Sequence, residues 1–228
     1  MSFFSPLDIA ALAFFVLAWI AYAVAVEGTS FGESGLNGRI NAYRALWLNR
    51  TLARDTRMVD MQIMTALNSG TAFFASTSLI AIGAALSLLR ATEEVLPLLS
   101  GLPVGVITSR EQWEAKTLGL VVILVYAFFK FSWSYRLFNY VAIMLGAMPP
   151  VAEKDTAEAQ TQVVRTTRVF VEAGRHFNRG QRALFFALGY LGWYIHPLVL
   201  VVTTAAVFAV MVRRQFASAP LRALQDRQ

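Results

Sequence analysis

Three side chains that could hold an anion lie within long apolar stretches of this chain. Lys130 and Arg136 interrupt the apolar segment 117–150, and His196 lies in another such segment near the C-terminal end. At 1.5 Å per residue, Arg136 lies roughly 18 Å and Lys130 roughly 27 Å from the expected end of their helix. His196 lies roughly 20 Å into its own segment by the same count. A guanidinium and an imidazole are therefore expected at one depth without an acid beside them, which predicts an anion site or pathway.

The aromatic residues around these cations offer a different interpretation. The run 128–136 resembles the belt of aromatic side chains found where a membrane meets water, with its two cations reaching toward the headgroups. The membrane would then end near Tyr135, and residues 137–148 would form a helical extension packed against other helices. Purely structural pairing is a third interpretation, and His196 taken alone is more typical of a satisfied core histidine than of a ligand.

Small polar side chains gather in the apolar segment 63–89. Asn68, Thr71 and Thr77 are candidate pore-lining residues of this segment. Asn139, in the next apolar segment, is a further candidate. Small residues and hydroxyls also let helices approach closely and hydrogen-bond across their contact. The pattern therefore predicts either tight helix packing or a hydrated pore face.

Features that would indicate an enzyme are missing from the sequence. There are no cysteines, which excludes disulfides, thiolate metal sites and thiol nucleophiles. The sequence shows no metal-ligand spacing of His, Asp and Glu, no nucleophile elbow and no glycine-rich phosphate loop. We therefore expect no catalytic residues, no metal site and no cofactor.

The composition indicates that the candidate residues are carried by membrane helices. Apolar residues make up 57% of the 228 residues, charged residues only 15%, and the mean hydropathy is +0.53. Soluble domains are typically close to half apolar and a quarter charged. We predict an all-α integral membrane protein with four transmembrane helices and two basic amphipathic cytoplasmic helices. Because a crossing needs about 20 residues, the expected spans cover about 7–26, 63–89, 113–148 and 183–212. They form one membrane domain, 1–214, which a polar tail, 215–228, follows.

Local signals mark where two of these helices begin. Ser5 precedes Pro6 and Asp8, which is the pattern of a cap followed by a helix start. Ser109 and Gln112 have the spacing of a capping box. The first apolar segment could be taken for a signal peptide, but no Lys or Arg precedes it and its apolar run is too long. We therefore expect it to be a retained span.

Arginines and lysines are concentrated in two of the loops. The loops at about 27–62 and 149–182 are strongly basic, whereas the loop between them carries four glutamates. The positive-inside rule therefore predicts that both basic loops face the cytoplasm and that both termini lie outside. The C-terminal tail opposes this prediction with Arg213, Arg214, Arg222 and Arg227. Loops facing anionic lipid explain the net charge of +6, so we expect no nucleic-acid partner.

Both basic loops have the periodicity of amphipathic helices, over about 39–56 and about 156–181. One interpretation places these helices on anionic headgroups of the bilayer. The other packs them on each other or on a neighbouring subunit as a cytoplasmic collar. The arginines expected to contact headgroups are Arg44, Arg50, Arg165, Arg168 and Arg175.

Several stretches of the chain resemble the motifs of one membrane-protein family. The longest comprises residues 129–140, FKFSWSYRLFNY, with Gly146 and Ala147, and the others lie at 67–77, 176–183 and 193–197. Over roughly residues 8–214 the sequence is similar to a family of bacteria and plants catalogued as domain of unknown function 599. The resemblance implies a bacterial inner-membrane protein with four spans, and it brings no known activity, substrate or catalytic residue.

These observations favour a small oligomeric membrane channel or transporter, with anions as the preferred species. Arg136, His196 and Lys130 would shape its electric field, and segment 63–89 would line the path. Four spans alone rarely enclose both a polar lining and buried cations, so a homo-oligomer is expected. The alternative is a protein that does not conduct, either an accessory subunit of a larger membrane complex or a lipid-binding membrane protein.

Overall fold

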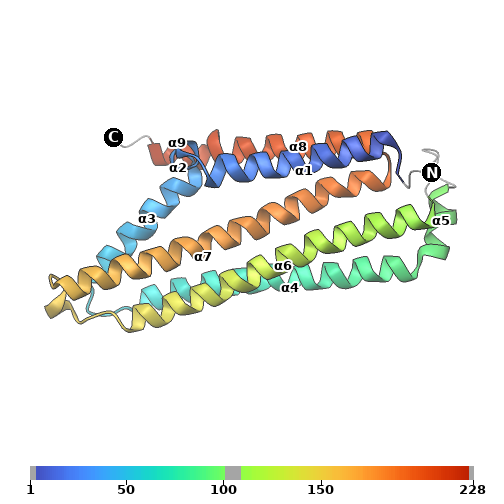
Figure 1. The fold of residues 1–228 in the computed structure, drawn as a ribbon. Coiled ribbons are helices and arrows are strands. Elements are labelled where there is room, and N and C mark those ends of the chain that lie inside the picture. Colours follow the sequence, from blue (N-terminus) through green and yellow to red (C-terminus); the bar gives the residue numbers. More distant parts are fainter. Residues whose placement is uncertain (1–3, 101–108, 226–228) are drawn as a thin grey trace.

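The computed structural model describes residues 4–100 and 109–225, and its regular elements there are all helices (Figure 1). The long ones are α1 (Pro6–Glu27), α3 (Leu36–Thr51), α4 (Met58–Arg90), α6 (Arg110–Gly146), α7 (Ala157–Tyr190) and α8 (Pro197–Phe216). The short ones are α2 (Ser30–Ser34), α5 (Thr92–Ser100), α9 (Ala219–Gln225) and the 3-10 turns η1 (Val151–Glu153) and η2 (Leu191–Tyr194). The predicted all-α fold class is confirmed.

Both predicted helix starts are present. The Ser5 hydroxyl accepts the backbone N–H of Asp8 at 3.1 Å, and the Asp8 carboxylate accepts the backbone N–H of Ser5 at 3.2 Å. Ser109 and Gln112 make the same reciprocal pair at the start of α6. A capping box satisfies N–H groups that the first helical turn leaves without partners, so α1 and α6 begin where the sequence indicates.

Four helices are long and apolar enough to cross a membrane, as the sequence predicts. They are α1, α4, α6 and the stretch Pro197–Gln225 that contains α8. Large apolar side chains on these helices, such as Leu17, Ile80 and Val202, are more than half exposed. Exposed apolar surface of this extent marks contact with a membrane or a partner, and on helices of this length it marks lipid contact. The chain is therefore a multi-pass membrane protein.

The predicted fourth span, 183–212, is not one helix. α7 continues through its first part to Tyr190, the chain turns in η2, and α8 begins at Pro197. His196 between them is extended, with φ −162° and ψ 148°, and its Nδ1 accepts the backbone N–H of Leu198 at 3.2 Å. A residue before proline is disfavoured in a helix, whereas proline itself starts helices well. The pair His196–Pro197 therefore ends one helix and begins the next.

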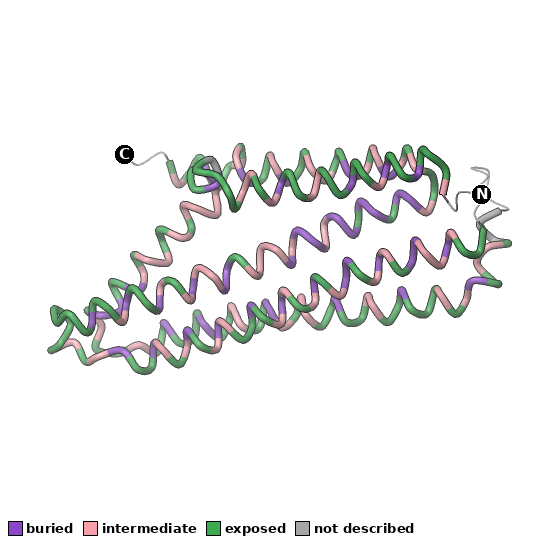
Figure 2. Tube along the Cα trace, in the orientation of Figure 1, coloured by how far each residue is buried: buried purple, intermediate pink, exposed green. Residues whose placement is uncertain are grey.

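The second predicted amphipathic helix, 156–181, is the first part of a longer helix. α7 continues without a break to Tyr190, and its last turns are buried among the other helices (Figure 2). Phe186, for example, has no exposed surface. The first amphipathic helix, predicted over 39–56, corresponds to α3 and ends earlier, at Thr51. The polar beginning of α7 and its enclosed end are therefore one rigid rod.

Differences in helix length divide the molecule into two parts. α1 and α8 have 22 and 20 residues, whereas α4, α6 and α7 have 33, 37 and 34. At one end of the molecule the three long helices run past the ends of α1 and α8, and α3 joins them there (Figure 1). We call the part that contains α1 and α8 the slab, and the protruding part with α3 the extension.

Each part has its own apolar core. Phe131 and Phe186 belong to a cluster of buried side chains inside the slab. Leu48 of α3 and Phe170 of α7 belong to a separate cluster inside the extension. The extension is therefore held by packing of its own, so it does not depend on lipid for its contacts.

The slab has the thickness of a membrane's hydrocarbon core. From Asp8 to Glu27, α1 rises roughly 28 Å at 1.5 Å per residue. The hydrocarbon core of a bilayer is about 30 Å thick. Lys130 interacts electrostatically with Glu27, which places it at the end of the slab, and Arg136 follows in the extension. This arrangement fits the interpretation of the aromatic run as an interfacial belt with a helical extension beyond it.

The two chain ends lie at opposite ends of the slab (Figure 1). α1, α4, α6, α7 and α8 pass through it in turn, because the second half of α7 returns between the other helices. Among the described residues, α7 is not one of the four helices that are long and apolar enough to cross a membrane, so the side on which each terminus lies stays a prediction. Arg213, Arg214 and Arg222 lie at the same end as both basic loops, which removes the conflict of charge. Arg227 lies outside the described residues.

Candidate functional site

The cations of the predicted anion site lie far apart. The Lys116 Nζ donates to the carbonyl of Trp193 at 2.9 Å, which places the start of α8, with His196, level with Lys116. Arg136 lies roughly 30 Å further along α6. The predicted shared depth of Arg136 and His196 is therefore wrong. It rested on a continuous helix over 183–212, whereas His196 is an exposed residue at the end of the slab.

Aromatic rings of their own helix hold Lys130 and Arg136. The Lys130 Nζ lies 5.0 Å from the centroid of the Tyr126 ring. The Arg136 Nε donates to the Tyr140 hydroxyl at 2.6 Å, and the guanidinium lies over the same ring. Because Arg136 is exposed, it needs no buried counter-ion. Lys130 therefore lies at the end of the slab and Arg136 lies beyond it, and their contact with a membrane interface stays a prediction.

Two of the four candidate pore-lining residues join helices within this chain, and the other two bond to their own helix. The Asn68 Nδ2 donates to the Asn139 Oδ1 at 3.1 Å, which joins α4 to α6. The hydroxyls of Thr71 and Thr77 donate to carbonyls of their own helix at 2.8 and 2.9 Å. Thr71 is buried and Thr77 is exposed, so the two do not share a lining. The arrangement agrees with the packing interpretation, and a pore between subunits stays a prediction.

Arg44, one of the predicted headgroup contacts, lies between α3 and α7. Its guanidinium lies 5.1 Å from the centroid of the Phe170 ring, and it donates to the Asn41 Oδ1 at 2.6 Å. Burial lowers the pKa of Arg44. A Cβ on Gly174 would come within 2.3 Å of the guanidinium, so glycine is what lets Arg44 lie across α7. Arg44 therefore serves the α3–α7 contact.

The other predicted headgroup contacts are exposed, and they differ in depth. Arg175 lies close to the end of the slab, one turn before Arg179. Arg168 and Arg165 lie roughly 16 and 21 Å before Arg179 along α7, inside the extension. Arg50, near the end of α3, also belongs to the extension. Only Arg175 of this group lies close to the end of the slab, and contact of these arginines with headgroups stays a prediction.

A buried polar cluster closes the slab at the end away from the extension. The Asp8 Oδ1 accepts the Trp193 indole N–H at 2.8 Å, while Lys116 binds the carbonyl of the same tryptophan. The Tyr190 hydroxyl donates to the carbonyl of Lys116 at 3.1 Å. These groups satisfy one another, so the cluster is a structural joint between α1, α6 and η2. Among the described residues, no three His, Asp or Glu side chains gather as a metal site would require.

Charged residues join α1 to α7 at the other end of the slab. Glu27 ends α1, and its Oε2 accepts the Arg179 Nε at 2.7 Å. Its Oε1 accepts an N–H of Arg182 at 2.7 Å. The side chain of Arg182 is only 6% exposed, so Glu27 neutralises a cation inside the bundle. This pairing lets the second half of α7 enter the slab despite its charges.

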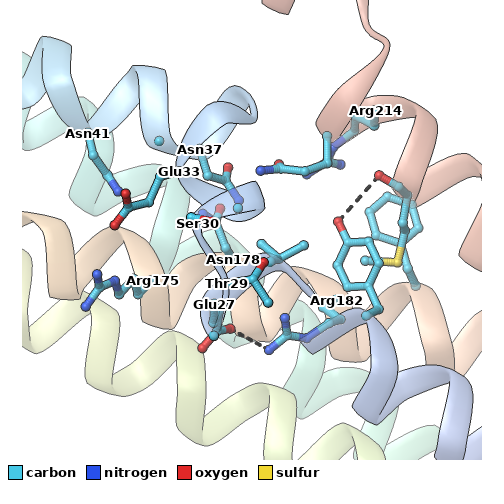
Figure 3. A pocket seen from close by; sticks show the side chains of 18 residues that line it. Glu27, Thr29, Ser30, Glu33, Asn37, Asn41, Arg175, Asn178, Arg182 and Arg214 are labelled. Atoms are coloured by element: carbon cyan, nitrogen blue, oxygen red, sulfur yellow. Dashed lines mark hydrogen bonds and ion pairs between the residues drawn. The ribbon is translucent and has the colours of Figure 1, made fainter. Parts of the chain in front are cut away.

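A polar pocket of about 340 Å³ opens beside this cluster, where α1, α2, α3, α7 and α8 meet (Figure 3). Its volume is within the range of small-ligand sites, about 300–1,000 Å³. We call it the junction pocket. Charged and polar side chains dominate its lining, which includes Glu27, Glu33, Arg175, Arg182, Arg214, Asn37, Asn41, Asn178, Gln215, Thr29 and Ser30. Sequence reasoning found only Arg175 of these, because the lining comes from five separate elements.

Two buried N–H donors of the junction pocket's lining have no partner within the described part of the chain. They are the Arg182 Nε and the Gln215 Nε2. Both residues are about 5% exposed or less. A Cβ on Gly35 would lie 2.6 Å from the Gln215 Nε2, so the absence of a side chain there keeps room for this amide. A buried donor without an acceptor costs about 1–3 kcal/mol, so both groups call for an acceptor.

His176 lies beside the cations at this end of the slab. Burial, together with the positive charges of Lys130 and Arg179, lowers the pKa of His176, and the carboxylates of Glu172 and Glu27 oppose this effect in part. Its ring meets that of Trp133 edge to face, with centroids 6.4 Å apart. Protonation of His176 therefore adds a third positive charge beside those of Lys130 and Arg179.

This arrangement predicts that acidification destabilises the protein. Because the folded-state pKa of His176 lies below the unfolded value of about 6.5, the unfolded chain binds the proton more readily. Its contribution to stability is therefore complete above about pH 6.5 and is lost as the pH falls through that value. We expect unfolding midpoints in detergent to fall between pH 7 and 5.5, and to fall less in His176→Gln. Equal slopes in His176→Gln and wild type would contradict the prediction.

Comparison with known families assigns most of the chain. A family model described as "Protein of unknown function, DUF599" matches residues 10–220. Comparison with the curated proteins and with the solved structures finds no match. The matched range includes both cores, the junction pocket and the whole extension. The chain therefore belongs to the DUF599 family.

Proposed function

We propose that this protein is a bacterial inner-membrane protein that binds the phosphate-bearing headgroup of a phospholipid in the junction pocket. The observation that carries the proposal is a cavity lined by three arginines, in which two of the lining residues, Arg182 and Gln215, each hold a buried N–H donor without a partner among the described residues. Phosphate oxygens are strong acceptors for guanidinium and amide N–H groups. A phosphate in the pocket would therefore pair with the exposed Arg214 guanidinium, and it would satisfy the Arg182 and Gln215 donors if these side chains turn toward it.

The position of the pocket supports a lipid as the source of that phosphate. Glu27 is the last residue of α1, and Arg214 lies in the last turn of α8, so the pocket lies at the end of the slab. Headgroups occupy this level, because the hydrocarbon core of about 30 Å lies within a bilayer of about 40–45 Å. A headgroup could therefore enter the pocket while its acyl chains remain in the membrane.

We also propose that the extension end faces the cytoplasm. Both basic loops share this end with Arg213, Arg214 and Arg222, whereas Glu93 and Glu94 lie at the other. Positively charged segments next to spans remain on the cytoplasmic side. The two chain ends would then lie on opposite sides of the membrane, with the N-terminal end outside.

Single cysteines test this orientation, because the chain has none of its own. We expect a membrane-impermeant maleimide to label Glu94→Cys in intact spheroplasts and to leave Ala219→Cys unlabelled until the membrane is opened. Both positions are exposed, so access to the reagent is decided by the membrane rather than by the fold. Reversed labelling would contradict the orientation. Labelling of both positions in intact spheroplasts would contradict the odd number of passes.

Lipid binding is tested by a pair of neighbouring arginines. Arg214 lines the junction pocket, whereas Arg213 does not, and both are exposed at the end of α8. We expect Arg214→Gln to weaken phospholipid binding about tenfold or more, because it removes a charge-assisted hydrogen bond to phosphate. Native mass spectrometry of the detergent-purified protein, titrated with phosphatidylethanolamine and phosphatidylglycerol, counts the lipids that remain bound.

The control variant distinguishes lipid binding in the pocket from general attraction of lipid to the positive charge at this end of the slab. Arg213→Gln removes the same charge from the same helix turn, and it should bind phospholipid as the wild type does. Equal losses in both variants would show that the surface attracts lipid without using the pocket. Binding of glycerol 1-phosphate as tight as binding of the lipids would show that the ligand is soluble.

The oligomeric channel or transporter, and the accessory subunit of a larger complex, stay predictions. A second copy of the chain has a surface to approach on α4, where a Cβ on Gly70 or Gly83 would meet nothing within 4 Å. Small residues on an outer helix face are typical of helix–helix contacts in membranes. Ion flux into liposomes that hold the purified protein separates conduction from lipid binding alone.

A further inference from the structure

The junction pocket presents one positive and one negative charge that have no ion-pair partner within the described residues. Of its five charged lining residues, Arg182 pairs with Glu27, and Arg175 pairs with Glu172 outside the pocket. Arg214 and Glu33 remain. Arg214 makes a hydrogen bond to Gln181 at 3.2 Å and lies over the ring of Phe185, and neither contact neutralises its charge.

These two charges stand on different elements and at opposite sides of the cavity. Figure 3 shows Glu33 on α2 beside Asn41, and Arg214 on α8 across the pocket. A ligand that carries only a phosphate would satisfy the Arg214 side and would leave a carboxylate facing it. A ligand that carries an ammonium at a short distance from its phosphate would satisfy both sides.

Building on the proposed function, we propose that the junction pocket selects a zwitterionic headgroup, in which a primary ammonium accompanies the phosphate. In this arrangement the phosphate takes the N–H groups of Arg214, Arg182 and Gln215, and the ammonium donates to the Glu33 carboxylate. Phosphatidylethanolamine has this chemistry, whereas phosphatidylglycerol carries hydroxyls in place of the ammonium.

A comparison of two lipids across two variants tests the selection. We expect wild-type protein to bind phosphatidylethanolamine at least fivefold more tightly than phosphatidylglycerol. Glu33→Gln should abolish this preference by weakening only phosphatidylethanolamine binding, whereas Arg214→Gln should weaken the binding of both lipids. Glu33 is exposed on its helix, so its replacement leaves the fold intact. Glu158→Gln, at an exposed position on the extension, removes the same charge away from the pocket and should keep the wild-type preference.

The outcomes distinguish this inference from the proposed function. Equal binding of the two lipids by the wild type, with Arg214→Gln still weakening both, would overturn the zwitterion selection alone. A preference that survives Glu33→Gln would do the same. Lipid binding that ignores Arg214→Gln would overturn the proposed function. If O-phosphoethanolamine displaces the lipid at equal concentration, the ligand is a soluble zwitterion and the lipid source is overturned.

Discussion

Glu27→Gln is expected to destabilise the folded protein by about 2–4 kcal/mol, because it leaves a buried guanidinium without its counter-ion. Arg179 and Arg182 both donate to this one carboxylate, and the Arg182 side chain is only 6% exposed. Removal of one partner of a buried pair typically costs about 3–5 kcal/mol, and the partial exposure of Glu27 reduces the expected loss. Denaturant or thermal unfolding in a fixed detergent measures the change.

An exposed ion pair at the other end of the slab provides the control for Glu27. Glu93 pairs with Arg110, and the Glu93 side chain is 76% exposed. Glu93→Gln should change stability little, since exposed ion pairs are screened by water and salt. The double variant Glu27→Gln, Arg182→Met should recover part of the loss, because it also removes the unpaired cation. A Glu27→Gln midpoint indistinguishable from that of Glu93→Gln would show that this pairing does not hold α7 in the slab.

The second large effect is expected from a single methyl group at Gly180. A Cβ there would lie 2.8 Å from two ring carbons of Phe131, which has no exposed surface. The ring cannot retreat easily, because it stacks on Phe74 and meets Phe177 edge to face, with centroids 5.4 and 5.5 Å away. Gly180→Ala should therefore separate α7 from α6 and destabilise the protein by about 1–3 kcal/mol, the usual cost of overpacking.

Gly83 is the matched control for this substitution. It also lies within a long helix, but nothing lies within 4 Å of its Cβ position. Gly83→Ala should be neutral or stabilising by up to about 1 kcal/mol, since alanine favours the helix more than glycine does. Phe131→Leu combined with Gly180→Ala should restore part of the lost stability by making room. Equal unfolding midpoints for Gly180→Ala and Gly83→Ala would contradict the close approach of α6 and α7.

The two effects test different supports of one helix. Glu27 holds α7 by charge at the end of the slab, while Phe131 and Gly180 hold it by fit against α6. If both variants lose stability and both compensating variants recover part of it, then the ion pair of Glu27 and the packing of Phe131 on Gly180 both hold α7 in the slab. The junction pocket depends on this pass, because Arg182 lines it from α7.

Features that act on one helix at a time could be predicted from the sequence. A span next to lipid must be apolar along its whole length, so α1, α4 and α6 are visible in the sequence alone. The caps at Ser5 and Ser109 are also local, because each satisfies N–H groups within one turn of itself. One of three interpretations of the aromatic run 128–136 placed the end of the membrane near Tyr135, and the slab ends one to two turns earlier, at Lys130.

Only the tertiary structure decided how the remaining segments are placed. The second half of α7 passes through the slab because Glu27 neutralises Arg182 and because the surrounding helices shield α7 from lipid. Neither condition can be predicted from the hydropathy of α7 itself. The position of His196 depends on the path of α7 through the slab, so the depth predicted for His196 was also wrong. The junction pocket is assembled from side chains of five elements, and residues as distant as Glu33 and Arg214 meet there only after folding. The sequence by itself determined that this is a helical membrane protein with one basic end, because contact with lipid and helix capping depend on local residues. Contacts between helices decided the path of α7 through the slab, the positions of the chain ends and the lining of the pocket.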